Sequence, residues 1–307
     1  MTDLSANLPG ARRGLPAAAQ RHSRRFAGLR RLWVKAGWPI RLCMATLLGL
    51  IAVAVLAPLF APFDPNAQSL LARLRPPAGF DRAMAAHPLG TDQLGRDILS
   101  RSLFGLRLTL AIATLGSLLS LVLGTTLGIL AGYLRGRTGA LIMALVNVQI
   151  AVPFTLIALL VIAVFGTSLP VLIAVIGLSG WEHYARVVRA QVLSISRMPF
   201  IEAATAAGAS HARILWRHVL PNLASLLIVL WTMTFSSLIL LESTLSFLGL
   251  GVQPPTATLG SMVGLGRDYL ASAPWIALLP AMGIMLVSLL VLLIGDWLRD
   301  ALDVKLK

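Results

Sequence analysis

Charged residues are scarce in this chain of 307 residues, and their scarcity sets the first limit on what the protein is. Only 12% of the residues are Asp, Glu, Lys or Arg, whereas soluble proteins carry about 25%. Apolar residues make up 57% of the chain, and its mean hydropathy is +0.82. This composition excludes an ordinary soluble domain and predicts a protein that lies in lipid.

Cysteine and acidic residues are also rare. The single cysteine, Cys43, excludes an internal disulfide. Asp and Glu number 12 against 26 Lys and Arg, so the formal net charge is +14. Nucleic acid is one partner for such a charge. The basic residues, however, form no patch interleaved with aromatic residues in a folded domain, and we expect no nucleic-acid partner.

The chain lacks the motifs that hold nucleotides or metals. It contains no G-x-x-x-x-G-K-[ST] sequence and no Rossmann glycine pattern after a strand. His87, Asp92 and Asp97 could ligate a metal, but their spacing fits no standard site. We therefore expect no cofactor, no metal and no catalytic residue in this chain.

Long apolar runs predict an all-α polytopic membrane protein with six transmembrane helices, because a helix needs about 20 apolar residues to cross a bilayer. The runs are residues 42–60, 106–134, 140–165, 169–180, 223–250 and 274–298. The fourth run is short for a span. It reaches the required length only by extending through Trp181 and Tyr184, which suit the membrane interface.

The positions of Lys and Arg predict the orientation, because cytoplasmic loops carry an excess of them. Residues 1–41 contain nine, and placing this segment inside puts nineteen of the 26 on the cytoplasmic side. Both termini are then cytoplasmic, with a basic, partly disordered tail over residues 1–41 and a short tail over residues 299–307. Residues 61–105 become an extracytoplasmic loop, and residues 106–298 hold the other five helices.

A polar, basic segment at residues 186–222 separates the fourth and fifth spans and predicts a docking loop. Pro199 can open a short helix, and Glu202 falls in its first turn, where a carboxylate is favourable. Small residues at helical spacing then form a ridge that another surface can approach closely. This ridge consists of Ala203, Ala204, Ala207 and Gly208.

Gly208 can end that helix in a left-handed conformation. Ser210 can then cap a second short helix over residues 211–220, after which Pro221 opens the fifth span. The alternative is an amphipathic helix that lies on the membrane without a partner. Such helices usually bury larger apolar residues than the Ala and Gly found here.

Glu242 is the one acidic residue inside an apolar run. A carboxylate at membrane depth is costly, so it should face the bundle interior or a water-filled path. It is therefore the candidate for the translocation path, where it would line the path or contact a substrate amine. A structural hydrogen bond to a neighbouring helix, or a place near the outer interface, remains the alternative.

Four motifs, in order, resemble those of the permease subunits of the dipeptide and oligopeptide (peptide/nickel) ABC importers. Glu202-Ala203-Ala204, Gly208 and Leu220-Pro221 resemble the family's cytoplasmic EAA loop. The other three motifs read HPLGTD-x-x-GRD-x-L-S-R at residues 87–101, E-x-x-L-S-F-L-G-L-G-x-Q-P-P at 242–255, and GD-x-LRD-x-LD at 295–303. The resemblance covers residues 40–303, although Leu259 stands where the family usually has Trp.

The resemblance implies a multi-pass subunit of the bacterial inner membrane that forms a translocation path and is not an enzyme. Its implied partners are a second homologous permease subunit, two ABC ATPase subunits that bind ATP and magnesium, and an extracytoplasmic solute-binding protein. Glu202, Ala203, Ala204 and Gly208 would form the ATPase-coupling site.

The sequence leaves the substrate open among dipeptides, oligopeptides, glutathione-like peptides and nickel chelates. Two other functional classes also stay open. An ion-gradient-driven secondary transporter would need inverted repeats and several ionisable residues in mid-membrane, of which only Glu242 is available. The remaining class is a membrane scaffold that transports nothing.

Overall fold

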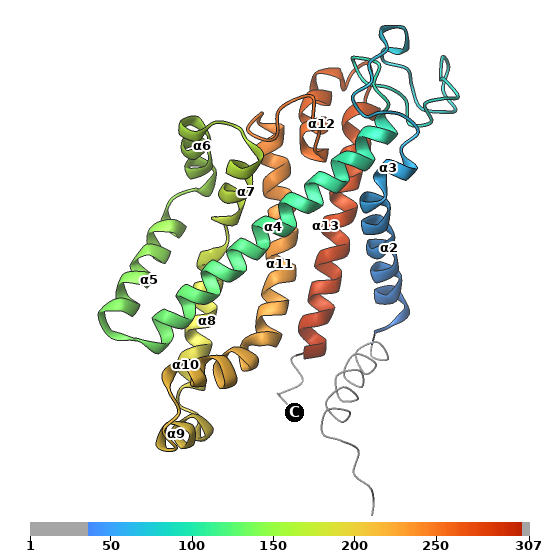
Figure 1. Cartoon of the computed structure of the whole chain (residues 1–307). Coiled ribbons are helices and arrows are strands. Elements are labelled where there is room, and N and C mark those ends of the chain that lie inside the picture. The colour runs from blue at the N-terminus through green and yellow to red at the C-terminus, as the bar shows by residue number, and fades with distance from the viewer. Residues whose placement is uncertain (1–35, 303–307) are drawn as a thin grey trace, which may run out of the picture.

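Long apolar helices run side by side in the computed structural model, which describes residues 36–302 (Figure 1). The predictions for most of the basic tail and for the last five residues fall outside this range. The elements in chain order are α2 (Trp38–Val55), α3 (Ala57–Phe60), η1 (Leu70–Ala72), α4 (Ile98–Tyr133), α5 (Gly136–Ala151), α6 (Phe154–Phe165), α7 (Leu169–Gly177), α8 (Trp181–Ile195), α9 (Pro199–Ala206), α10 (His211–Ile214), η2 (Leu215–Val219), α11 (Leu220–Phe247), α12 (Leu259–Gly266), η3 (Arg267–Tyr269) and α13 (Trp275–Leu302).

Five helical segments are long and apolar enough to cross a bilayer, and a bent pair raises the number to six. The five are Trp38–Val55, Ile98–Tyr133, Leu169–Ile195, His211–Phe247 and Trp275–Leu302. Large apolar side chains are exposed on these helices and on the bent pair, for example Leu48 in the first span and Leu141 and Leu160 in the pair, as expected for helices in contact with lipid. The predicted all-α polytopic membrane fold is confirmed.

The third predicted span is broken in its middle. Residues 140–165 were expected to form one helix, but α5 and α6 meet at an angle of 91°. Pro153 explains the break, because it has no backbone N–H and disfavours a helical conformation at the preceding residue. Val152 accordingly has an extended backbone, with φ −102° and ψ 129°.

Several other helices extend beyond their predicted bounds, and α13, for example, continues to Leu302 rather than to residue 298. α4 begins at Ile98 rather than at residue 106, because the Asp97 side chain accepts a hydrogen bond from the Ser100 N–H and caps the helix. The fourth span is not short, since α7 and α8 together reach Ile195. Gly180 joins these two helices in a left-handed conformation, with φ +86°.

A row of glycines on α4 brings its backbone against α7 and α8. We call Gly116, Gly124, Gly128 and Gly132 the glycine row. A Cβ atom at Gly128 would lie 2.8 Å from the Val188 Cβ, and one at Gly132 would lie 2.9 Å from the Val192 Cβ. Small residues four apart allow such close contact between membrane helices, where dispersion forces rather than hydrophobic burial drive association.

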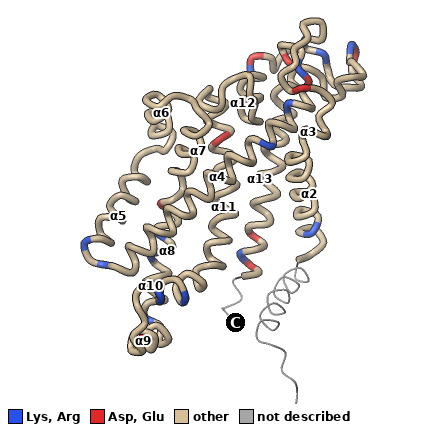
Figure 2. Tube along the Cα trace, viewed as in Figure 1, with Lys and Arg blue, Asp and Glu red and all other residues tan. Residues whose placement is uncertain are grey.

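The bundle has two different ends (Figure 1). Residues 61–97, which we call the cap, lie over one end, and α9 projects from the other. α4 crosses the bundle obliquely from the cap to the end that carries α9. Figure 2 shows that the charged residues gather mainly in the cap and at the ends of the helices, with few along the middle of the bundle.

Candidate functional site

The projecting helix α9 has the features expected of a docking element. Pro199 occupies its first turn, and Glu202 follows in that turn with its side chain exposed. Ala203 is also exposed, whereas Ala204 is half-buried. Within the ridge of small residues, Ala203 therefore lies on the outer surface, whereas Ala204 is partly covered by the rest of the bundle.

Gly208 ends α9 as expected. Its φ is +77°, in the left-handed region, and a Cβ atom there would meet nothing within 4 Å. The Gly208 N–H donates to the Thr205 carbonyl at 2.9 Å, and the Ala209 N–H donates to the Ala204 carbonyl at 3.0 Å. These two bonds form a Schellman motif, which fixes the direction in which the chain leaves the helix.

Buried side chains anchor α9 and α10 to the bundle. Ile201 and Ile214 pack in one apolar cluster with Val192 and Ile195 of α8. In addition, the Tyr133 hydroxyl and the His211 Nδ1 are hydrogen-bonded at 2.7 Å, which ties the end of α4 to the start of α10. A force on α9 would therefore reach α4, α8 and α11.

The second short helix of the predicted loop does not end before Pro221. Ser210 caps α10 by accepting a hydrogen bond from the Arg213 N–H, but α10, the π-helical turn η2 and α11 then follow without a break. The expected separation at residue 220 was therefore wrong. Pro221 lies near the start of α11, and the preceding π-helical turn gives its ring room within the continuous helix.

Glu242 is fully buried near the C-terminal end of α11, with 0% of its surface exposed. The Ser246 hydroxyl donates a hydrogen bond to its Oε1 at 2.7 Å. Its Oε2 is buried without a hydrogen-bond partner, although the hydroxyls of Ser243, Thr258 and Thr109 lie nearby. These groups come from α4, α11 and the residue that precedes α12, so Glu242 lies where three elements meet.

The short helix α12 was missed by the sequence analysis, which treated its residues as a loop. Thr258 and Ser261 form a capping box at its start, in which each side chain accepts a hydrogen bond from the other's backbone. Leu259, at the position where the family usually has Trp, is only 2% exposed, and its N–H donates to the Thr109 hydroxyl at 3.1 Å. The capping pair in the sequence could have revealed this helix.

The cap is held by a buried network of charged side chains. Arg96 Nε donates to Asp92 Oδ2 at 2.6 Å, and Arg101 Nε lies 3.6 Å from the same oxygen. Asp97 pairs with His87 at 2.9 Å while it caps α4. Arg96 and Asp92, four residues apart, thus form a buried ion pair. No group of three potential metal ligands occurs within residues 36–302.

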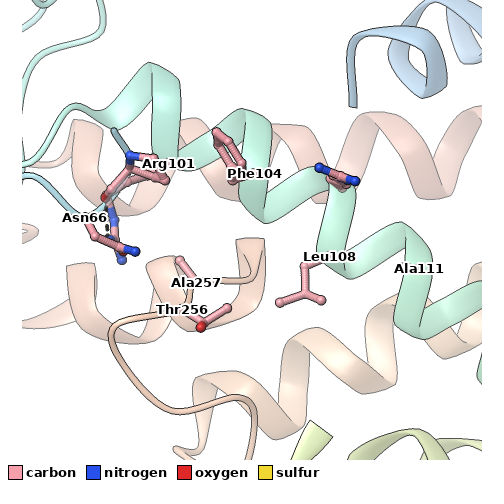
Figure 3. Close-up of a pocket in the computed structure, with 9 residues that line it drawn as sticks. Asn66, Arg101, Phe104, Leu108, Ala111, Thr256 and Ala257 are labelled. Atoms are coloured by element: carbon pink, nitrogen blue, oxygen red, sulfur yellow. Dashed lines mark hydrogen bonds between the residues drawn. The ribbon is translucent and has the colours of Figure 1, made fainter. Parts of the chain in front are cut away.

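A cavity of about 350 Å³ lies between the outer surface of α4 and the loop that precedes α12 (Figure 3). Arg101, Phe104, Leu108 and Ala111 line it from α4, and Thr256 and Ala257 face them from the loop. Arg101 donates to the Pro65 carbonyl at 3.0 Å, which joins the wall of this cavity to the network in the cap.

Comparisons with known proteins agree with this architecture. The profile of the family described as binding-protein-dependent transport system inner membrane component matches residues 124–307. The profile described as N-terminal TM domain of oligopeptide transport permease C matches residues 41–77. A chain of the MetNI methionine ABC transporter has a similar fold, with a TM-score of 0.53 and 20% identity over 66% of this chain and 97% of its own.

Two curated relatives are similar over most of their length. The di/tripeptide transport system permease protein DppC of Pseudomonas aeruginosa is 42% identical, over 84% of this chain and 85% of its own. The glutathione transport system permease protein GsiD of Pectobacterium atrosepticum is 38% identical, over 84% of each chain. With a family match over residues 124–307 and identity of this level, the chain belongs to the family of binding-protein-dependent transport system inner membrane components.

Proposed function

We propose that this chain is the permease subunit of an ATP-driven importer of short peptides. The two relatives described above are named for di/tripeptides and for glutathione, which is itself a short peptide. Peptide is the substrate class that these names share, and it is therefore the class that we assign. The chain would form the translocation path and bind no nucleotide itself.

The projecting helix α9 is the observation that carries the coupling part of this proposal. An exposed helix start at Glu202, a small-residue surface at Ala203 and Ala204, and a fixed turn at Gly208 together form a compact docking element. We assign this element to contact with a separate ATPase subunit. The complete importer would contain two ATPase subunits, a second homologous permease subunit and an extracytoplasmic solute-binding protein.

In this proposal the end that carries α9 faces the cytoplasm and the cap faces the opposite side, which agrees with the predicted orientation of both termini. ATP binding would close the ATPase dimer and move α9, and the anchored helices would then open the path outward. Hydrolysis would reset the complex. The substrate contributes only its differential affinity for the two states.

Glu242 has two possible roles in this mechanism, and its burial favours one of them. Its full burial and its hydrogen bond from Ser246, which accepts in turn from Thr258 at the start of α12, support a role in linking α11 to α12. We propose that it is a positioning residue beside the path. Direct contact with a substrate amine is the competing role.

Uptake in a reconstituted system tests the proposal. The chain would be purified with its partner ATPase, permease and binding-protein subunits, and placed in liposomes with labelled di- and tripeptides outside. We expect uptake that requires ATP in the liposomes and the binding protein outside. Uptake that persists with a catalytically inactive ATPase and disappears with an ionophore would instead support a secondary transporter.

A further inference from the structure

A second cavity lies within the cap, away from α9 and from Glu242. Its volume is about 460 Å³, and the start of α13 closes one side of it. The lining residues are Arg73, Leu74, Arg75, Pro76, Asp81, Arg82, Ser272 and Trp275. Three arginines and one aspartate give this pocket, which we call the arginine pocket, an excess of positive charge.

Hydrogen bonds hold the wall of the arginine pocket in place. The Leu74 N–H donates to the Asp92 carbonyl at 3.1 Å. Arg75 exchanges two bonds with Thr91, since its N–H donates to the Thr91 hydroxyl and its carbonyl accepts from the Thr91 N–H, both at 2.9 Å. Trp275 Nε1 donates to the Thr91 carbonyl at 3.1 Å. The pocket is therefore built on the buried charge network of the cap.

Backbone strain is concentrated in the same wall. Leu74 has a φ of +51° and Arg82 a φ of +64°, and they are two of the three non-glycine residues with positive φ in the part of the chain that the structure describes. Such conformations are unfavourable for residues with a side chain and persist where the surroundings enforce them. Both strained residues belong to the wall of the arginine pocket.

The positive charge in the pocket is not neutralised from within. None of the ion pairs among residues 36–302 joins Asp81 to a pocket arginine. Arg73 and Arg75 do contact the Gln93 and Leu71 carbonyls, but a carbonyl carries no full charge. The Arg75 Nε is moreover buried without a hydrogen-bond partner. A carboxylate from outside would neutralise this charge through the exposed guanidinium groups of Arg73 and Arg82.

We propose that the arginine pocket receives an acidic side chain of the extracytoplasmic solute-binding protein. This inference rests on the proposed function, which places the cap outside the cell membrane and requires a binding protein to dock there. Charge complementarity supports this occupant, because a preformed cationic pocket steers an acidic surface into one orientation. The exposed side chains of Arg73 and Arg82 leave the pocket open to such a partner.

The test measures how much binding protein is needed for half-maximal stimulation of ATP hydrolysis. The complete complex would be placed in nanodiscs of a zwitterionic lipid, at low salt. We expect Arg82→Asn to raise the half-saturating concentration by about three- to tenfold, the scale of one interface ion pair. Asn tolerates the left-handed backbone of residue 82, so this change removes charge without adding strain.

Two further variants act as matched controls. Arg82→Lys keeps the charge, and its half-saturating concentration should stay close to that of the wild type. Asp81→Asn removes the one acidic group of the pocket, and we expect it to lower the half-saturating concentration. A folding defect would not produce opposite shifts from two adjacent neutralisations. High salt should shrink both shifts, because it screens exposed charges.

Equal half-saturating concentrations for the wild type and Arg82→Asn would overturn the inference. A shift that appears only when the nanodiscs contain anionic lipid would also overturn it, because the pocket would then bind a lipid headgroup. A wild-type complex that the binding protein does not stimulate at all would instead contradict the proposed function. The two failures are therefore distinguishable.

Discussion

The Ser246 hydroxyl donates a 2.7 Å hydrogen bond to the carboxyl group of Glu242, one turn earlier in α11, and both residues are buried. The Ser246 oxygen in turn accepts a bond of 3.3 Å from the Thr258 hydroxyl. Since Thr258 begins the capping box of α12, the carboxyl group is linked to the position of that helix. This relationship defines a test of the role of Glu242.

Glu242→Gln and Glu242→Ala should have different effects. The amide oxygen of Gln can still accept the Ser246 bond, so we expect transport per assembled complex and substrate preference to stay close to the wild type. Ala removes the acceptor and leaves the buried Ser246 hydroxyl without it, at a cost of about 1–3 kcal/mol. Membrane abundance and thermal stability should then fall, as measured by quantitative immunoblotting and thermal melting of the purified complex.

A role in substrate contact predicts another pattern. If the Glu242 carboxylate binds the amino group of the substrate, Glu242→Gln would reduce the uptake of peptides with a free amino group more than that of N-acetylated peptides. Such a change in preference at normal abundance would contradict the positioning role.

Gly208→Leu should uncouple the permease from its ATPase and leave insertion intact. A Cβ atom at Gly208 meets nothing within 4 Å, so a leucine side chain strains only the local turn at φ +77° and projects toward the surface that we assign to the partner. We expect uptake and stimulated ATP hydrolysis to fall by about tenfold or more, the effect of losing a central interface contact. Membrane abundance is measured in parallel.

Two companion variants complete that experiment. Gly208→Asn is a matched control, since Asn accepts the left-handed conformation with a smaller side chain, and it should retain more activity than Leu. Glu202→Lys reverses an exposed charge in the first turn of α9 and should weaken coupling as well. Wild-type stimulation of ATP hydrolysis by the Leu variant would rule out the assignment of α9.

The orientation can be measured by labelling single cysteines. In a Cys43→Ser background, Ala86→Cys in the cap and Ala206→Cys in α9 both provide exposed positions. We expect a membrane-impermeant thiol reagent to label position 86 in intact spheroplasts and position 206 only after the membrane is opened. The reverse pattern would invert the topology, and labelling of both from one side would contradict it.

The glycine row should be sensitive to size. Gly128→Leu would drive a side chain into Val188 and the Ala185 backbone, and overpacking of this kind costs about 1–3 kcal/mol. We expect lower abundance and a lower melting temperature. Gly49→Leu is the matched control, because Gly49 lies in another membrane helix with nothing within 4 Å of an added Cβ atom. Equal losses in both variants would show that the packing is not the cause.

Local signals in the sequence predicted much of the fold. Apolar runs identified the long helices, and Pro199 and Gly208 set the start and the end of α9. The break at Pro153 was also visible, as a proline within an apolar run, but the length of the run favoured one continuous helix. The apolar runs therefore predicted the number of membrane spans more reliably than whether each span is one unbroken helix.

Contacts between distant residues could not be predicted in this way. The hydroxyl group of Thr109 reaches the N–H of Leu259, which is 150 positions away, and no local pattern specifies that pair. The surroundings of Glu242 depend on the same long-range packing, which is why two roles stayed open for it. Likewise, the arginine pocket joins residues 73–82 to the start of α13, and only the folded chain brings them together.

The absence of a break between α10 and α11 has a mechanical consequence. His211–Phe247 is one helical stretch of 37 residues, which changes direction near the π-helical turn η2 before α11 runs along the bundle (Figure 1). Its α10 end is clamped beside α9, and its other end carries Glu242 and supports α12. The 28 residues of α11 alone, at 1.5 Å per residue, give a lever about 42 Å long, on which a tilt of about 5° displaces the far end by about 4 Å. Small movements on one side of the membrane would thus be amplified on the other through a helix with no break in its chain.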